Sequence, residues 1–139
     1  MAYANRGMTY GLMKQYDKAI EDCEKALALL PGDSYVQGVL DTARENKGKI
    51  EAYTRQIEAN PDDVEAIFSR GYKYFERKMY DEAVADFTKA IEVTPDDPDA
   101  YNNRGLCYYY KGDYDKAIED YTHALELASG DLRLYNNRG

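Results

Sequence analysis

The side chains that could do chemistry in this chain are few and are not grouped as catalysis requires. Its one histidine, His123, has no nucleophile or metal-ligand spacing nearby, and Cys23 and Cys107 follow the apolar pattern of their helices as small packed residues. Neighbouring carboxylates such as Glu119 and Asp120 point in different directions from a helix, so they do not form an acid–base pair. We therefore expect a chain that is not an enzyme, with no catalytic residue, no metal site and no cofactor.

Charged residues at one regular spacing predict structural ion pairs instead. In the one stretch where the arginine column holds Leu40, the aspartate column holds Ala52, so the two charges occur together or not at all. A half-buried arginine needs a partner, because an unpaired buried charge is costly. We predict that each pair joins the two helices of one hairpin. Each arginine is followed by its aspartate at the same separation in all three cases: Arg6 and Asp22, Arg70 and Asp86, Arg104 and Asp120.

These pairs belong to a longer pattern that repeats along the chain. Gly71, Gly105 and Gly139 are equally spaced, and tyrosine and alanine columns around them recur in the same register. An earlier copy around Gly7 precedes the Gly71 copy by slightly less than two of these periods, so the copy between them is shortened. The loss is about four residues, roughly one helical turn. Self-similarity at a period of about 34 residues is typical of an array of helical repeats.

Each copy predicts two helices that pack closely as a hairpin. In residues 98–131, Asp97 and Pro98 form a helix start, and Gly112 supplies the left-handed conformation that ends the first helix. Gly105 and Ala117 are small residues in mid-helix, which let two backbones approach closely. A single hairpin cannot bury both of its faces, so stability must come from stacked neighbours. Prolines end the second helices of the earlier copies: Pro31, Pro61 and Pro95.

The recurring Tyr-x-x-x-Gly-x-x-Tyr, Tyr-Asp-x-Ala, Ala and Pro columns resemble those of the tetratricopeptide repeat. Tyr101 stands where the family often has tryptophan, and Arg104 where it often has leucine. The resemblance implies an all-α fold, a right-handed superhelix (α-solenoid) of antiparallel helical hairpins, whose first helices line a concave groove. It covers 1–139 as one array of about four repeats plus the start of a fifth: 1–33, a shortened 34–63, 64–97, 98–131 and a partial 132–139. Both ends fall inside a repeat, so we expect a fragment of a longer protein.

The shortened unit, 34–63, is expected to be a hairpin of unusual geometry. Its missing residues fall at the turn, where Lys49 alone replaces the usual Asp-Tyr-Asp-Lys-Ala, so its predicted helices cover 34–47 and 50–59. Asp41, Lys49 and Gln56 occupy columns that elsewhere hold Gly, Ala and Ala, and long side chains separate packed backbones. We expect these two helices to lie farther apart, or at a different angle, than those of the other hairpins.

Residues rotated away from the hairpin contact are predicted to line the concave groove. They combine aromatic rings, which accept apolar side chains, with asparagine amides, which hydrogen bond to a peptide main chain. For Phe68 and Tyr109, packing against the adjacent hairpin is an equally good interpretation. The predicted groove residues are Asn5, Met8, Phe68, Tyr72, Phe75, Asn102, Asn103, Leu106, Tyr109 and Tyr110.

Some tetratricopeptide domains hold the C-terminal carboxylate of a chaperone with lysine, arginine and asparagine side chains of their first helices. Asn5, Asn103 and Asn137 resemble the asparagine of that clamp. Chaperone-tail binding is nevertheless disfavoured, because little positive charge is available to hold a carboxylate. The first-helix positions where the clamp needs basic residues hold Met1, Ala4, Glu65, Ser69, Asp99 and Asn102.

The net charge of −8 argues against nucleic acid and against an anionic membrane surface as partners. The predicted function is therefore a non-catalytic protein–protein interaction scaffold that binds a peptide or a partner domain in its groove. Two alternatives remain: a regulatory or substrate-recruiting appendage of an enzyme, and a structural module that assembles end to end. Apolar Leu132, Leu134 and Tyr135 near one end favour self-association through the ends.

Overall fold

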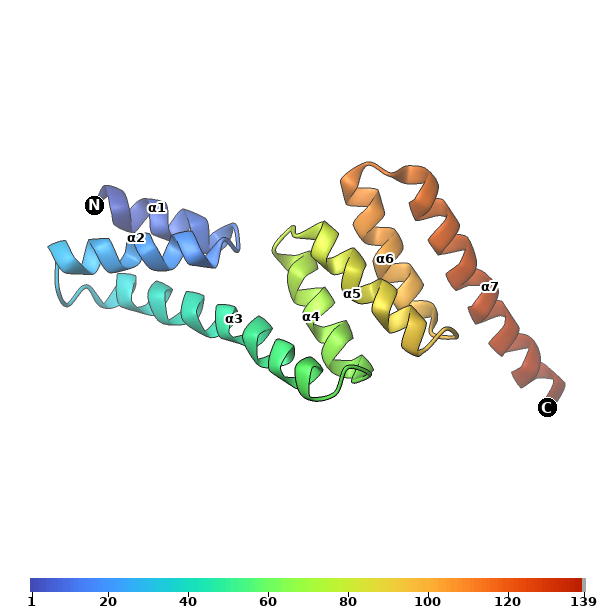
Figure 1. The fold of residues 1–139 in the computed structure, drawn as a ribbon. Helices are drawn as coiled ribbons and strands as arrows, with labels where there is room; N and C mark the ends of the chain where they lie inside the picture. The colour runs from blue at the N-terminus through green and yellow to red at the C-terminus, as the bar shows by residue number, and fades with distance from the viewer. Residues whose placement is uncertain (139) are drawn as a thin grey trace. The chain divides into compact units, whose positions relative to one another are not determined.

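The structure, a computed structural model, describes residues 1–138, with side chains described as far as Gly130. This part of the chain forms seven α-helices and contains no strand (Figure 1). The chain divides into two compact units, residues 1–52 (unit 1) and 53–139 (unit 2). The predicted all-α fold is confirmed. The helices are α1 (Ala2–Leu12), α2 (Tyr16–Leu29), α3 (Ser34–Ala59), α4 (Val64–Glu76), α5 (Tyr80–Val93), α6 (Pro98–Lys111) and α7 (Tyr114–Arg138).

Three hairpins form where the sequence supplies a complete turn, and they are α1–α2, α4–α5 and α6–α7. Each turn has one residue with positive φ: Lys14 at 57°, Lys78 at 60° and Gly112 at 81°. The predicted start of α6 is also present, because Asp97 Oδ1 accepts a hydrogen bond from the Asp99 backbone N–H at 2.9 Å and Pro98 occupies the first turn.

The two helices of each hairpin touch at the glycine column, as predicted. A Cβ atom placed on Gly7 would lie 2.9 Å from Cys23 Sγ, and one on Gly71 would lie 3.1 Å from Asp86 Cβ. At Gly105 the same atom would lie 3.0 Å from the Tyr121 ring. These distances are shorter than ordinary contacts of a Cβ atom, so glycine at these positions allows the helices to pack this closely.

Each unit has its own apolar core. In unit 1, Ala4 of α1 and Cys23 of α2 pack with Val36 and Leu40 of α3. In unit 2, one cluster joins the buried residues Ile67, Ala90 and Ala100, and a second joins Ala83, Phe87 and Cys107. The second helix of a hairpin is thus covered by the first helix of the next, which is the stacking that a solenoid needs.

The predicted hairpin of residues 34–63 is wrong. Residues Ser34–Ala59 form one continuous helix of 26 residues, α3, which contributes to both units. Gly48 has no positive φ, so the chain makes no turn there. With a single residue, Lys49, left from the usual turn and with Asp41 exposed in the glycine column, neither a turn nor a close helix contact favours folding back.

The predicted break before residue 132 is also wrong. Helix α7 runs without interruption from Tyr114 to Arg138, through the place where a fifth repeat was expected to begin. The equivalent helices α2 and α5 end shortly before Pro31 and Pro95, whereas Ser129 stands at this position in α7 and can continue a helix. The side chains of Leu132, Leu134, Tyr135 and Asn137 lie outside the described residues.

The three predicted ion pairs are confirmed, and each is bidentate. The Nε and Nη2 atoms of Arg6, Arg70 and Arg104 donate to the two carboxylate oxygens of Asp22, Asp86 and Asp120 over 2.6–2.9 Å. All three aspartates are buried. The hydrogen bond to Arg6 lowers the pKa of Asp22 and raises the pKa of Arg6, so both groups stay charged in the folded chain.

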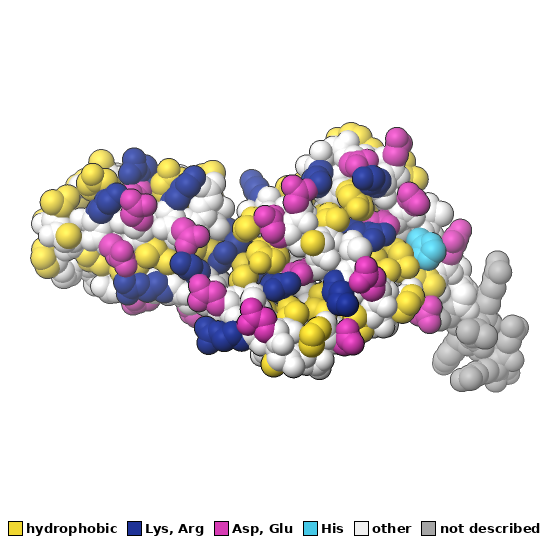
Figure 2. All heavy atoms as spheres, viewed as in Figure 1, with side chains coloured by type: hydrophobic (Ala, Val, Ile, Leu, Met, Phe, Trp, Pro, Cys, Tyr) yellow, Lys and Arg dark blue, Asp and Glu magenta, His cyan; other side chains and the backbone are white. Residues whose placement is uncertain are grey.

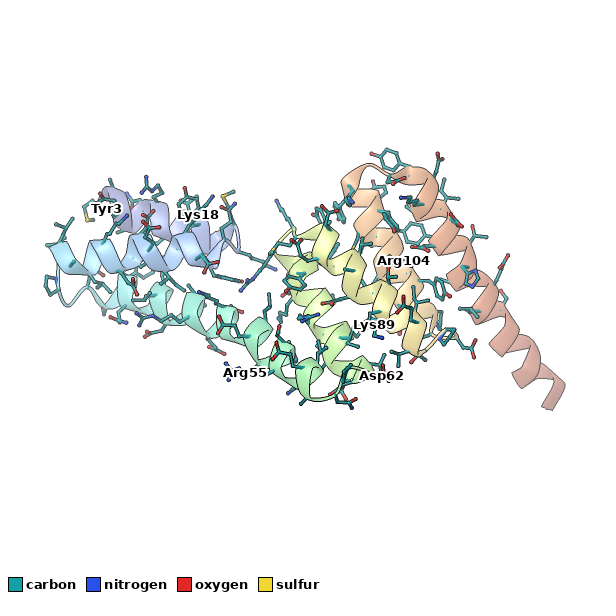
Figure 3. All side chains as sticks on the ribbon, viewed as in Figure 1. Tyr3, Lys18, Arg55, Asp62, Lys89 and Arg104 are labelled. Atoms are coloured by element: carbon teal, nitrogen blue, oxygen red, sulfur yellow. The ribbon has the colours of Figure 1, made fainter. Side chains whose placement is uncertain are left out.

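Two of these arginines also bond to the helix that precedes their own, a contact that was not predicted from the sequence. Arg70 Nη1 donates to Thr54 Oγ1, and Arg104 Nη1 donates to Thr88 Oγ1, each at 3.2 Å. Figure 3 labels the Arg104 side chain. Each threonine precedes its arginine by the same separation at which each aspartate follows it. The repeated Thr–Arg–Asp spacing was the available signal. Each of these guanidinium groups links the helix before its own to the helix after it.

We expect Gly48→Ala and Gly112→Ala to change stability in opposite directions. Gly48 lies inside α3 with open space around it, so alanine should stabilise the chain by about 0.5–1 kcal/mol. Gly112 has φ of 81°, where alanine is strained, so the same change should destabilise it by about 1 kcal/mol. Urea unfolding monitored by circular dichroism measures both, and destabilisation by Gly48→Ala would mean that residues 34–63 turn there.

We expect Arg104→Leu to destabilise the chain by about 3 kcal/mol or more, because Asp120, with a side chain only 6% exposed, would be left as an unpaired buried charge. The double variant Arg104→Leu, Asp120→Ala copies the Leu40 and Ala52 combination found in α3 and should recover most of this loss. The same urea titration compares them. Equal losses for the single and double variants would contradict this role of the pair.

Candidate functional site

Unit 1 contains an apolar groove between α1 and the first half of α3. Its volume is about 500 Å³. Gly11 and Gly38, from facing helices, leave the groove open, and Leu12 at its edge is 86% exposed. The lining residues are Met8, Gly11, Leu12, Tyr16, Ser34, Tyr35, Gly38, Val39, Thr42 and Ala43. Of the predicted groove residues, this site includes Met8.

Unit 2 fills the equivalent columns with aromatic rings. The Phe75 ring lies 5.7 Å from both Tyr80 and Tyr110, and Tyr80 and Tyr110 stack with an angle of 9°. Tyr72 and Tyr109 extend this cluster through ring contacts of 6.4 Å to Phe75 and 5.5 Å to Tyr110. Tyr72, Tyr109 and Tyr110 are still about half exposed, at 47%, 51% and 56%, so the cluster forms an aromatic surface.

The two sites differ because of the residue at one column. Gly11 of α1 corresponds to Phe75 of α4 and to Tyr109 of α6 in the repeat pattern. At the position of the Phe75 ring, unit 1 has no side chain, and this leaves space between α1 and α3. Gly11 was not among the predicted groove residues, although an aromatic column interrupted by glycine was a signal available in the sequence.

The remaining predicted groove residues are distributed between core and surface. Phe68 packs edge-on against the buried Phe87 ring at 5.2 Å and contacts both clusters of the unit 2 core, so it is a core residue. The Asn103 amide donates to the Asp99 carbonyl at 2.7 Å, which occupies one of its donors. Asn5 and Asn102 are exposed, and Leu106 is half-buried.

The reactive groups of the described residues are isolated. His123 is exposed, and its ring packs 4.4 Å from Tyr101. Among side chains up to Gly130, no three histidine, cysteine or carboxylate groups come together as a metal site would need. None of the described helices has the length and apolar character needed to cross a membrane. Acidic and basic side chains are mixed over the face seen in Figure 2.

We expect neither cysteine to react with a thiol reagent in the folded chain at pH 8. Cys23 and Cys107 are both fully buried, and burial raises the pKa of Cys23 and raises that of Cys107 to about 12. Because the thiolate is the reactive form, a raised pKa keeps both thiols protonated at this pH. Colorimetric thiol titration should detect both only in urea, and rapid labelling without urea would contradict the packing.

The recurring helical hairpins correspond to a known repeat. The tetratricopeptide repeat matches residues 1–33 and 98–131, and a second description of the same repeat matches residues 71–109. The chain belongs to the tetratricopeptide repeat family. Together the matched segments cover more than half of it and include all of α1, α2, α5 and α6, the end of α4 and the first part of α7.

One relative and two solved structures extend this result. The small glutamine-rich tetratricopeptide repeat-containing protein 2 of Saccharomyces cerevisiae is 31% identical over 83 residues, which are 55% of this chain and 23% of that protein. This chain therefore spans less than a quarter of that relative. MamA is 27% identical with a TM-score of 0.63, over 94% of this chain and 79% of its own. YrrB, described as a TPR protein with an unusual peptide-binding site, is 29% identical with a TM-score of 0.58, over 99% of this chain and 74% of its own. These similarities support a role in protein–protein interaction.

Proposed function

We propose that the chain is a non-catalytic interaction scaffold whose unit 1 groove binds a peptide segment presenting a bulky apolar side chain. The groove volume of about 500 Å³ carries this proposal. It falls within the range of about 300–1,000 Å³ that is usual for ligand pockets. Met8, Val39 and Ala43 offer apolar contact inside it, so transfer of a leucine-sized or aromatic side chain from water would favour binding.

Hydroxyl groups around the same groove suit a peptide main chain. Ser34, Tyr35 and Thr42 of α3 all line it. The Thr42 hydroxyl donates to the Gly38 carbonyl at 2.9 Å, so its oxygen is oriented to accept a hydrogen bond from a peptide N–H. Such contacts hold a backbone without reading its side chains, while the apolar groove selects the inserted side chain.

The aromatic surface of unit 2 is a second contact area for the same kind of partner. Tyr72, Tyr109 and Tyr110 are half-exposed rings held by neighbouring rings, and tyrosine is enriched at the energetic centres of interfaces. The peptide-binding site named for YrrB, a structural relative, supports peptide recognition as the mode of binding.

The test is Gly11→Phe, which would place in unit 1 the type of ring found at Phe75. The Cβ atom would lie 3.6 Å from Val39 Cγ1, an ordinary contact, so the chain should still fold. We expect peptides selected from a phage-displayed random library on the unsubstituted chain to bind Gly11→Phe at least ~10-fold more weakly in calorimetry, a loss of about 1.4 kcal/mol.

Ala28→Phe, a matched addition of a ring at an exposed position of α2, should leave binding unchanged. Peptides that bind Gly11→Phe normally but lose affinity for Tyr72→Ala and Tyr110→Ala would place the main site in unit 2. Peptides insensitive to all of these changes would show that the concave residues are the wrong surface.

A further inference from the structure

Unit 2 shows which kind of group the fold accommodates at the place where unit 1 has its groove. Phe75 occupies the column of Gly11, and its ring packs 5.7 Å from that of Tyr80, with an angle of 56° between the two rings. Tyr80 in turn occupies the column of Tyr16, which is half-buried and lines the groove of unit 1. Unit 1 therefore keeps the tyrosine of this contact but has glycine in place of the ring that packs on it.

A methionine lines the groove at another position that holds a ring in unit 2. Met8 occupies the column of Tyr72, and the Tyr72 ring lies 6.4 Å from that of Phe75. The polarizable sulfur of methionine makes favourable contacts with aromatic rings, and its unbranched side chain adapts to their shape. Met8 thus suits a ring placed where Phe75 lies in unit 2.

Helix α3, on the other side of the groove, leaves room for such a ring. Gly38 and Thr42 line the groove in the columns that hold Asn102 and Leu106 in α6. Both residues are smaller than their counterparts, so space is left on the side of α3 as well as on the side of α1. The resulting volume of about 500 Å³ accommodates a whole aromatic side chain.

The charges around the groove narrow the choice of side chain further. None of the ten lining residues is charged, although charged residues make up 32% of the chain. A lysine, arginine or carboxylate side chain of a partner would lose hydration there without gaining an ion pair. A leucine would also be uncharged, but a ring gains an edge-to-face contact with tyrosine beyond the apolar area that it buries.

Resting on the proposed function of this groove, we propose that the bound segment inserts an aromatic side chain that packs against Tyr16, as Phe75 packs against Tyr80. The inserted ring fills the space that Gly11 leaves open, so the partner supplies in unit 1 the contact that the chain makes by itself in unit 2. Tyr16 is then the residue that sets the preference for an aromatic over an aliphatic anchor.

Calorimetry with a library-selected peptide tests the anchor. The peptide is one that binds the whole unsubstituted chain and is weakened by Gly11→Phe, and each of its aromatic residues is changed in turn to leucine. We expect one of these changes to weaken binding about 3- to 10-fold, the effect of one ring–ring contact. A groove-binding peptide that has no aromatic residue, or that tolerates every change to leucine, would overturn the aromatic anchor and leave the groove as the binding site. Peptides insensitive to Gly11→Phe would overturn both.

Variants of Tyr16 test its role in this preference. Tyr16→Leu keeps an apolar side chain but removes the ring, so the peptide and its leucine version should bind this variant within ~2-fold of each other. Tyr16→Phe keeps the ring and should retain the full preference.

Tyr3→Leu is the matched control, because it makes the same change on α1 outside the groove, and it should behave as the unsubstituted chain does. Circular dichroism confirms that the three variants fold. An undiminished preference in Tyr16→Leu, or an equal loss of preference in Tyr16→Leu and Tyr3→Leu, would refute the assignment of Tyr16.

Discussion

Close contact between two helix backbones decides where this chain folds back on itself. At Gly7, Gly71 and Gly105 the opposing helix lies so near that an added Cβ atom would be only 2.9–3.1 Å from it. Where the same column holds Asp41, the chain forms no hairpin and continues as α3. A helix pair needs both the small residue and a turn that reverses the chain, and residues 34–63 lack both. The other features of the fold depend on this contact, because it brings the paired side chains of each hairpin together.

The arginine column is the clearest example of that dependence. In a hairpin, Arg104 on α6 reaches Asp120 on α7 and Thr88 on α5, so a single planar group with several donors joins three helices. The carboxylate is buried, and the bidentate geometry supplies the partner that a buried charge requires. This polar link replaces part of the apolar contact that leucine would make at this position, and it fixes the spacing between stacked hairpins.

The variable columns carry the functional differences between the units. Unit 1 and unit 2 use the same helix positions, yet Gly11 leaves a groove and Phe75 fills the corresponding space with a ring. This column is separate from the glycine column at which the two helices of a hairpin meet, so its residue can change without altering that contact. A repeat array can therefore change what it binds while keeping the residues that hold its helices together.

The sequence alone determined the repeat, the three complete hairpins and the arginine–aspartate pairs, because these depend on residue spacing within one or two adjacent helices. It also indicated that residues 34–63 would depart from the other repeats, because Lys49 replaces the usual turn and Asp41 stands in the glycine column. Only the tertiary structure decided that α3 and α7 continue past their expected turns, since a helix break reflects the balance between local turn chemistry and the packing that folding back would gain. The tertiary structure likewise moved Phe68 into the core and opened the groove at Gly11. An aromatic ring can be buried in the core or can line a groove, depending on which side chains face it from neighbouring helices. The residue type at a single repeat position does not specify those neighbours.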